Sequence, residues 1–178
     1  MSSLTYAIAS TPFGELLLAA CDGGVVALVF GDAEVESIAW LGAEFPQRQL
    51  RRDDGALDAT IAAALASLDG PSRDPLPLAG VGTEFQKRVW LALGRIPYGE
   101  TRTYTQLAAM VDRPNAVRAV ASACANNPIS LLVPCHRVVG ADGSLRGYRW
   151  GLERKRKLLE HEKRMRHVHP RLALARSA

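Results

Sequence analysis

Hydrophobic and polar positions over the first thirty residues follow a strand pattern. Three β-rich runs, 6–9, 15–20 and 25–30, are separated by the turn sequences TPFG (11–14) and DGG (22–24). Short runs joined by turns that contain glycine are typical of β-hairpins. The pattern predicts a three-stranded antiparallel meander.

The pattern then changes to a helical one. Helices are predicted at about 33–44 and 56–68, and in the second of these the apolar residues Leu57, Ile61 and Leu65 recur at helical spacing. Asp69-Gly70-Pro71 ends this helix, and the proline-rich stretch 71–77 reads as an extended linker. We place a domain boundary there, with one α/β domain at 1–80.

Two capping-box spacings organise the second half of the chain. Thr83 with Gln86 opens a helix that carries Phe85, Val89, Trp90 and Leu93 on one face, and Thr103 with Gln106 opens a helix that runs to Met110. A further helix is predicted at 117–125. Two short helices joined by a tight turn form a candidate helix-turn-helix. An ordinary pair of core helices has the same pattern.

The helix at 117–125 consists mainly of small residues around one large polar side chain, Arg118. Small residues let a helix lie close to another surface, and a single guanidinium projecting from them can enter a groove or replace a base in a stack. The alternative is an alanine-rich core helix whose Arg118 is paired with an acid. The sequence does not separate the two.

Charge is distributed unevenly between the two halves. Residues 1–80 carry 4 Lys or Arg against 11 Asp or Glu, whereas residues 81–178 carry 18 against 7. A basic half attached to an acidic one is expected when one face meets a polyanion such as nucleic acid. A solvated basic surface is the alternative. The composition, 48% hydrophobic and 22% charged, is that of a globular protein.

Several classes of protein are disfavoured by what the sequence lacks. No apolar run approaches the roughly 18 residues that cross a bilayer, and no secretory signal opens the chain, so a cytoplasmic protein without membrane contact is expected. The cysteines Cys21, Cys124 and Cys135 are odd in number and widely spaced. Neither a disulfide framework nor a bound metal is predicted.

Candidate chemistry lies where the apolar run 131–133, a short buried-strand signal, meets Pro134-Cys135-His136-Arg137. A cysteine is nucleophilic as the thiolate, so it needs a neighbouring base or cation, and His136 and Arg137 are the local candidates. In an unbent strand Cys135 and His136 would point to opposite faces, so a bend or a bridging water is implied. Most cysteines, however, are simply small buried hydrophobes.

The motifs around Cys135 resemble the active-site region of the O6-alkylguanine-DNA alkyltransferases. They are, in this sequence, NPI (127–129), PCHRV (134–138), GY (147–148) and LLEHE (158–162), with GTEFQ (82–86), IPYGE (96–100) and RAV (118–120) ahead of them. The match covers about residues 82–163. It implies an α+β fold in which a small N-terminal sheet with helices precedes a mostly helical domain, 81–163, and leaves 164–178 as a basic tail that is expected to be disordered.

The resemblance also implies residue roles in DNA binding. In the family the damaged base is flipped out of duplex DNA that is bound through the minor groove. Arg118 matches the arginine that fills the gap, and Tyr104 the tyrosine that assists flipping and donates a hydrogen bond to the guanine ring. Ala119 and Thr105 are expected beside them on the DNA-facing helices. Without the family, Tyr104 would read as a core aromatic at a helix start.

The chemical roles follow in the same way. Cys135 matches the alkyl acceptor, His136 acts on it through water, and Glu162 completes the relay, although Glu162 alone would read as a solvated carboxylate. Asn127 matches the asparagine that ties the helix pair to the cysteine turn. The substrate pocket is implied at Val138, Tyr148, Arg149 and Trp150, and Trp150, where many relatives have glycine, is predicted to narrow it against O6-benzylguanine.

The implied activity is irreversible transfer of a methyl or other alkyl group from O6-alkylguanine, and from O4-alkylthymine, in DNA to Cys135. No cofactor or second nucleophile is suggested by a motif, so each molecule reacts once, as a monomer. Two alternatives stay open: a cysteine hydrolase that uses Cys135, His136 and Glu162, and an alkyltransferase-like protein that binds damaged DNA without chemistry.

Overall fold

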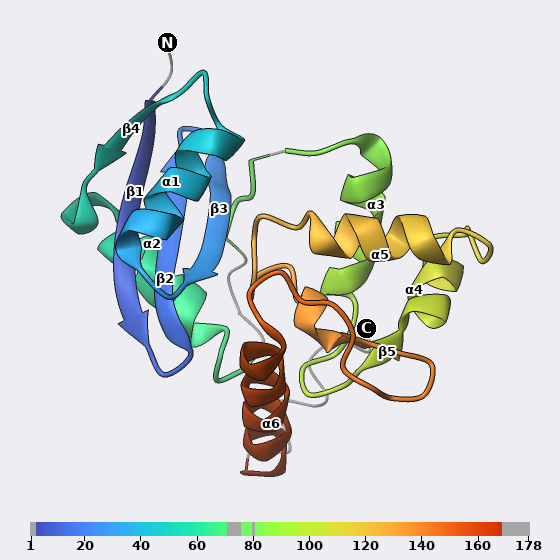
Figure 1. The fold of residues 1–178 in the computed structure, drawn as a ribbon. Helices are drawn as coiled ribbons and strands as arrows, with labels where there is room; N and C mark the ends of the chain where they lie inside the picture. Colours follow the sequence, from blue (N-terminus) through green and yellow to red (C-terminus); the bar gives the residue numbers. More distant parts are fainter. Residues whose placement is uncertain (1–2, 71–75, 80, 169–178) are drawn as a thin grey trace.

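The structure is a computed structural model that describes residues 3–70, 76–79 and 81–168. Its elements, in chain order, are β1 (Ser3–Thr11), β2 (Gly14–Cys21), β3 (Gly24–Gly31), α1 (Glu34–Glu44), β4 (Gln49–Arg52), α2 (Asp54–Ala66), α3 (Glu84–Gly94), β5 (Arg102–Thr103), α4 (Tyr104–Met110), α5 (Val117–Ala125), the 3-10 turn η1 (Cys135–Arg137), β6 (Val138–Val139) and α6 (Leu152–Val168). Figure 1 shows a sheet with two helices beside a mostly helical part, which confirms the predicted fold class. We call residues 3–70 the N-terminal half and 81–168 the C-terminal half.

The N-terminal sheet has the strand order β3-β2-β1-β4. Strands β1, β2 and β3 form the predicted antiparallel meander. The sequence reading missed β4, which pairs in parallel with β1. Three of its four residues are polar, and it lies at the sheet edge, where charged side chains on a short strand discourage pairing with other chains. The hydrophobic pattern therefore gave no signal for it.

The two faces of the sheet are covered by different helices. Leu17 of β2 packs in a cluster with Leu41 of α1, whereas its neighbours Leu16 and Leu18 pack in a second cluster with Leu57 of α2. Successive strand side chains point to opposite faces, which produces this division. Because both faces are buried, the strands read as continuous apolar runs.

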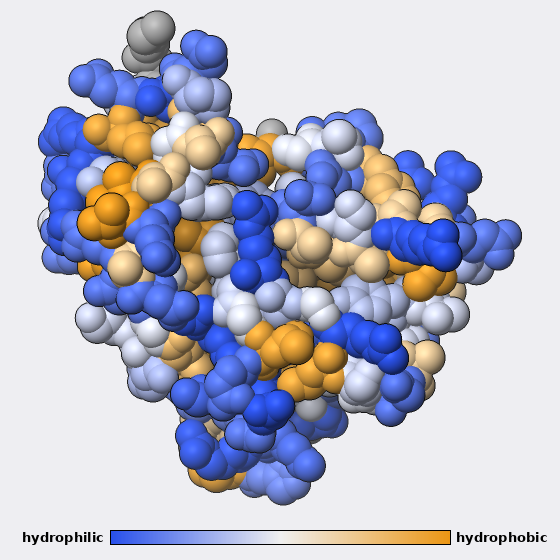
Figure 2. Space-filling model, in the orientation of Figure 1, coloured by the Kyte–Doolittle hydropathy of each residue, from blue (hydrophilic) through white to orange (hydrophobic). Residues whose placement is uncertain are grey.

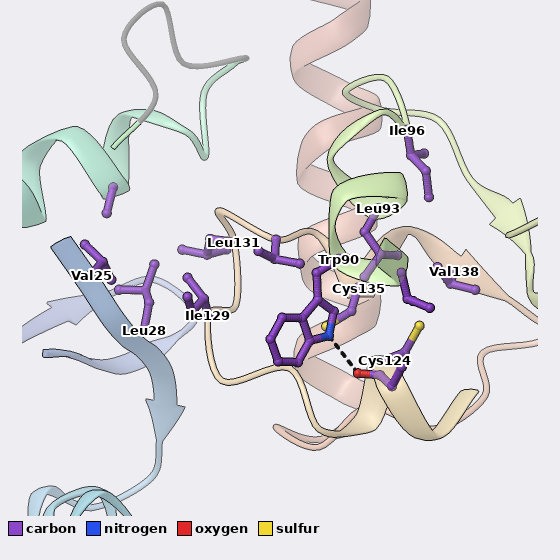
Figure 3. Close-up of a cluster of buried hydrophobic side chains, with 14 of the residues drawn as sticks. Val25, Leu28, Trp90, Leu93, Ile96, Cys124, Ile129, Leu131, Cys135 and Val138 are labelled. Carbon is purple, nitrogen blue, oxygen red and sulfur yellow. Dashed lines mark hydrogen bonds between the residues drawn. The ribbon is translucent and has the colours of Figure 1, made fainter. Parts of the chain in front are cut away.

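The second and larger cluster also includes side chains of the C-terminal half. In Figure 3, Val25 and Leu28 of β3 lie on one side, Ile129 and Leu131 lie between, and Trp90 and Leu93 of α3 follow. The outer edge of β3 is closed by the same segment, since the Leu28 amide donates to the Pro128 carbonyl at 2.8 Å and the Ser130 amide to the Leu28 carbonyl at 2.7 Å. The N-terminal sheet thus supports the chain that leads into the cysteine turn.

Both predicted capping boxes are present in the C-terminal half. The Thr83 amide donates to Gln86 Oε1 at 2.8 Å and the Gln86 amide to Thr83 Oγ1 at 3.3 Å. The corresponding distances at Thr103 and Gln106 are 2.8 and 3.1 Å. These bonds satisfy amides that a helix start leaves unpaired, so α3 and α4 begin where the sequence predicted. Helices α4 and α5 pack against each other and against α3.

The structure corrects the reading of residues 131–133. They form a turn and not a strand, and Leu131 has a φ of 66°, outside the strand region. Leu131 and Val133 are buried in the cluster that joins the two halves. The apolar character of these residues therefore indicates burial. A short apolar run does not show whether the buried segment is a strand, a helix or a turn.

Helix α6 extends into the predicted basic tail. Residues 164–168 are its last turn, and His167 is exposed there, while His169 and the rest of the tail lie outside the described residues. None of the helices within the described ranges has the length and apolar character needed to cross a membrane.

Candidate active site

Cys135 lies at the start of η1 and is 6% exposed. Buried Asn127 follows the C-terminus of α5 and donates from Nδ2 to Cys135 Sγ at 3.2 Å and to the Val133 carbonyl at 2.8 Å. Its Oδ1 accepts from the Ile129 amide at 3.0 Å. One amide side chain therefore connects the end of the helix pair to the start of the cysteine turn and to the segment before it.

The turn supplies the bend, which was one of the two possibilities that the sequence implied, the other being a bridging water. The Arg137 amide donates to the Pro134 carbonyl at 3.0 Å, which closes the 3-10 turn and directs His136 toward α6. His136 Nε2 lies 2.8 Å from Glu162 Oε1. His136 Nδ1 is buried and has no hydrogen-bond partner among the described residues. That nitrogen is therefore the one that remains to accept a proton.

Glu162 is a buried partner and not a solvated carboxylate, since it is 4% exposed. Arg137 donates to both of its oxygens at 2.9–3.1 Å and to the Ile96 carbonyl at 2.9 Å. Arg137 thus serves Glu162 and does not lie against the thiol as the sequence reading considered. The Gly99 amide adds a further bond to Glu162 at 3.0 Å.

The pKa directions follow from this arrangement. Burial alone would raise the pKa of Glu162, but His136 and Arg137 outweigh it and hold that pKa at about 2. Burial lowers the pKa of His136 despite Glu162, so the imidazole is neutral and can accept a proton. Burial raises the pKa of Cys135, opposed by Asn127 and Lys155. The free protein therefore holds a neutral thiol beside a neutral base that is backed by a carboxylate.

Lys155 is a site residue that the sequence reading missed. It is fully buried in α6, and its Nζ donates to the carbonyls of Val138 at 2.5 Å and Arg146 at 2.7 Å. Burial lowers its pKa to about 8, opposed by Cys135 and Cys124, so the cation lies within electrostatic range of the thiol. It lies in a run of basic residues to which the sequence analysis assigned no site role, but it shares a helical face with Leu158 and Glu162. That spacing was the available signal.

A hollow of about 560 Å³ opens between α4, α5 and the loop before α6. Its lining residues are Tyr104, Val117, Arg118, Ala121, Ala125, Arg146, Gly147, Tyr148 and Arg149. Figure 2 shows pale orange atoms of small apolar side chains over α5, with hydrophilic side chains around them. The space is lined by aromatic rings and guanidinium groups, which suits a planar base.

Arg118 is exposed at the rim of this hollow and forms no ion pair within the described ranges. This placement rejects the alternative of a core arginine paired with an acid. Ala119 and Thr105 are also exposed on α5 and α4 but do not line the hollow. Tyr104 Oη donates to the Arg146 carbonyl at 3.3 Å, and burial, followed by Cys124 and Cys135, raises the Tyr104 pKa to about 12.

The predicted pocket residues divide between two places. Tyr148 and Arg149 line the hollow, and Val138 is buried in β6 with its carbonyl bound by Lys155. Trp150 does not line it. The Gly151 amide donates to the Tyr148 carbonyl at 3.0 Å, and this turn sends the indole of Trp150 to the N-terminal half, where it meets Trp40 edge to face. The indole therefore lies away from the hollow, although the sequence placed it in the wall of the alkyl pocket, and its effect on O6-benzylguanine stays a prediction.

The ion pairs of Glu162 predict a pH-dependent stability. A carboxyl whose folded pKa is lowered from 4.5 to about 2 stabilises the fold fully above its unfolded pKa and loses this as pH falls toward 2. A shift of this size corresponds to about 3 kcal/mol. We expect Glu162→Gln to unfold more readily than wild type near neutral pH and the difference to shrink below about pH 4.5. Urea denaturation over this range measures it, and a pH-independent difference would contradict the buried ion pairs.

Comparisons with known proteins find relatives over most of the chain. A family model described as the DNA-binding domain of 6-O-methylguanine DNA methyltransferase matches residues 84–164. A methylated-DNA--protein-cysteine methyltransferase of Methanosarcina acetivorans is 44% identical over 160 residues, which are 88% of this chain and 97% of that protein. The bifunctional transcriptional activator/DNA repair enzyme Ada of Escherichia coli is 44% identical over 90% of this chain. This chain covers 46% of Ada, about half of its length.

A solved structure extends the likeness to the fold. The crystal structure of Mycobacterium tuberculosis OGT in complex with DNA has a TM-score of 0.75 and 37% identity, and the alignment covers 90% of this chain and 94% of that one. Because the Methanosarcina relative is matched over nearly its whole length, the likeness includes both halves of this chain. The chain belongs to the family of the methylated-DNA--protein-cysteine methyltransferases.

Proposed function

We propose that the protein repairs DNA by moving the alkyl group of O6-alkylguanine, and of O4-alkylthymine, onto its own Cys135. One observation carries the proposal. The buried Cys135 thiol, held by Asn127, is next in the chain to neutral His136, whose other nitrogen is bound to the Glu162 carboxylate. This arrangement can deliver a thiolate inside a protein that otherwise keeps the thiol protonated.

The proposed reaction is a single displacement at the alkyl carbon. The Cys135 proton passes through water to His136 Nδ1, and Glu162, kept anionic by Arg137, stabilises the imidazolium. The sulfur forms a bond to the alkyl carbon while the bond from that carbon to O6 breaks, and its electron pair stays with guanine. The guanine anion then takes a proton, which balances the one that the imidazolium gives back through water. Tyr104 donates a hydrogen bond to the departing ring. The product is a thioether, which water does not cleave, so each chain reacts once.

DNA is bound on the face formed by α4 and α5. The small residues of α5 allow close approach to the minor groove, and Arg118 enters the space that the flipped base leaves. The exposed position of Arg118 at the mouth of the hollow supports this assignment. All residues proposed for the chemistry come from one chain, so a monomer suffices.

Stoichiometry tests the proposal against the alternatives. A duplex that contains one O6-methylguanine is offered in excess, and restored guanine is counted per protein chain. We expect one guanine per chain and then no further reaction. Continued turnover, or release of product from an activated ester at a steady rate, would support the cysteine hydrolase. Tight binding with no restored guanine would support the damage-binding alternative.

A further inference from the structure

Arg149 stands between the hollow and a second groove that lies between the two halves of the protein. This groove has a volume of about 380 Å³. Its lining residues are Val29, Phe30, Gly31, Asp32, Glu36, Ser37, Trp40, Arg149, Trp150, Gly151 and Arg154. Arg149 borders both spaces, so whatever holds it from the side of the groove also shapes the side of the hollow.

Two indoles hold the Arg149 guanidinium. Its central carbon lies 5.3 Å from the ring centroid of Trp40 and 5.3 Å from that of Trp150. The two indoles meet each other edge to face, with centroids 5.6 Å apart and planes at 87°. A guanidinium over an indole is attracted by the charge distribution of the ring. Arg149 has no ion pair in the part of the chain that the structure describes, so these rings are its defined contacts.

The loop 140–151 needs such an external anchor. It contains turns but neither helix nor strand, and Gly143, Gly147 and Gly151 have positive φ values of 78°, 33° and 95°. The C-terminal half fixes its middle, because the Arg146 carbonyl accepts from Tyr104 and from Lys155 at 3.3 and 2.7 Å. The segment after Arg146 carries Gly147, Tyr148 and Arg149, which all line the hollow.

The N-terminal half fixes this second segment. Arg154, at the start of α6, donates to the Trp150 carbonyl, to the Phe13 carbonyl at 2.6 Å and to Asp32 at 2.6 Å. Trp40 belongs to α1 and is itself packed in the cluster on the face of the sheet that α1 covers. Figure 1 shows the loop entering α6 beside the N-terminal half.

We propose that Trp40 is a positioning residue for the alkyl pocket: by holding Arg149 and Trp150 it fixes the loop segment that forms the pocket wall. The inference rests on the proposed alkyl transfer for its kinetic consequence. It gives the acidic N-terminal half a part in substrate selection, although that half supplies no residue to the hollow. Loss of the Trp40 ring loosens the wall, which slows reaction with a small group, held by few contacts, more than reaction with a large one.

The test compares Trp40→Ala with Ile38→Ala, a control on the same helix and in the same cluster that does not line the groove. Rates are measured for methyl transfer from duplex DNA and for benzyl transfer from free O6-benzylguanine. We expect Trp40→Ala to raise the benzyl-to-methyl rate ratio by about three- to tenfold, the scale of one or two cation–π contacts. Trp40→Phe should recover part of the change, and Ile38→Ala should not alter the ratio.

Two further measurements keep the result unambiguous. Hydrogen exchange over 140–151 should become faster in Trp40→Ala and not in Ile38→Ala, and this readout needs no activity. Arg149→Ala should change the benzyl-to-methyl rate ratio as Trp40→Ala does, and the double variant should show no further change. If Trp40→Ala does not fold, Arg149→Ala carries the test. Unchanged exchange with an unchanged ratio, or additive single effects, would overturn the proposal. A wild-type protein that accepts no methyl group would instead overturn the proposed function.

Discussion

Replacing Cys135 by serine should abolish alkyl transfer while leaving the fold and DNA binding in place. The thiol and hydroxyl are similar in size, and Asn127 can donate to either, so the turn should persist. A serine hydroxyl ionises far less readily, and His136 alone cannot compensate. We expect transfer from an O6-methylguanine duplex to fall below about one thousandth of the wild-type rate, the scale seen when a nucleophile is removed. The affinity of Cys135→Ser for the same duplex measures whether DNA binding is retained.

The other two cysteines provide the controls. Burial, followed by the neighbouring Cys135, raises the pKa of Cys124 to about 12, so this thiol should stay unreactive. Cys21 is partly buried at the end of β2, in the N-terminal half. Cys124→Ser and Cys21→Ser should each retain transfer. Substantial transfer by Cys135→Ser, or loss of the methyl label in either control, would contradict the assignment of the acceptor.

Replacing Arg118 by alanine should impair repair of duplex DNA much more than reaction with a free O6-alkylguanine base. The free base needs no flipping and leaves no gap, whereas extrusion from a duplex costs a few kcal/mol that a filling side chain offsets in part. We expect a loss of about 10- to 100-fold on duplex DNA and little change on the free base. Single-turnover experiments with each of the two substrates measure these rates for wild type and Arg118→Ala.

Arg113→Ala is the matched control for Arg118. Arg113 is exposed in the turn between α4 and α5, where it can contribute no more than a screened phosphate contact. The loss of repair rate on duplex DNA in Arg113→Ala should be small and should disappear as the salt concentration is raised. Equal losses of Arg118→Ala on both substrates would mean that Arg118 supports the fold, and equal losses of the two variants on duplex DNA would mean that both are phosphate contacts.

Local sequence signals predicted much of the fold. The meander was predicted because its turns carry glycines at defined places, and α3 and α4 because Thr83 and Thr103 each have a glutamine three residues later that completes a capping box. The bend at Cys135 was inferred from the alternation of strand side chains. Such signals depend only on residues close together in the sequence, so they can be recognised without knowledge of the tertiary structure.

Features that depend on tertiary packing were missed or misread. The apolar run 131–133 is buried in a turn, and Lys155, in a basic stretch, is buried because α6 turns it toward Val138 and Arg146. The direction of Trp150 is set by the turn from Tyr148 to Gly151 and by Trp40, which lies far away in the sequence. No local pattern encodes these contacts. His136 was a candidate base because it follows Cys135, whereas the role of Glu162 came from the family resemblance, and the structure supplies the geometry of both.

The most direct test of the account is the mass of the intact protein after reaction with an equal amount of a duplex that contains O6-methylguanine. The account predicts that each chain gains one methyl group in place of one hydrogen, and that digestion locates S-methylcysteine in the peptide that contains Cys135. An unchanged mass together with restored guanine, or a methyl group on Cys21 or Cys124, would contradict transfer to Cys135.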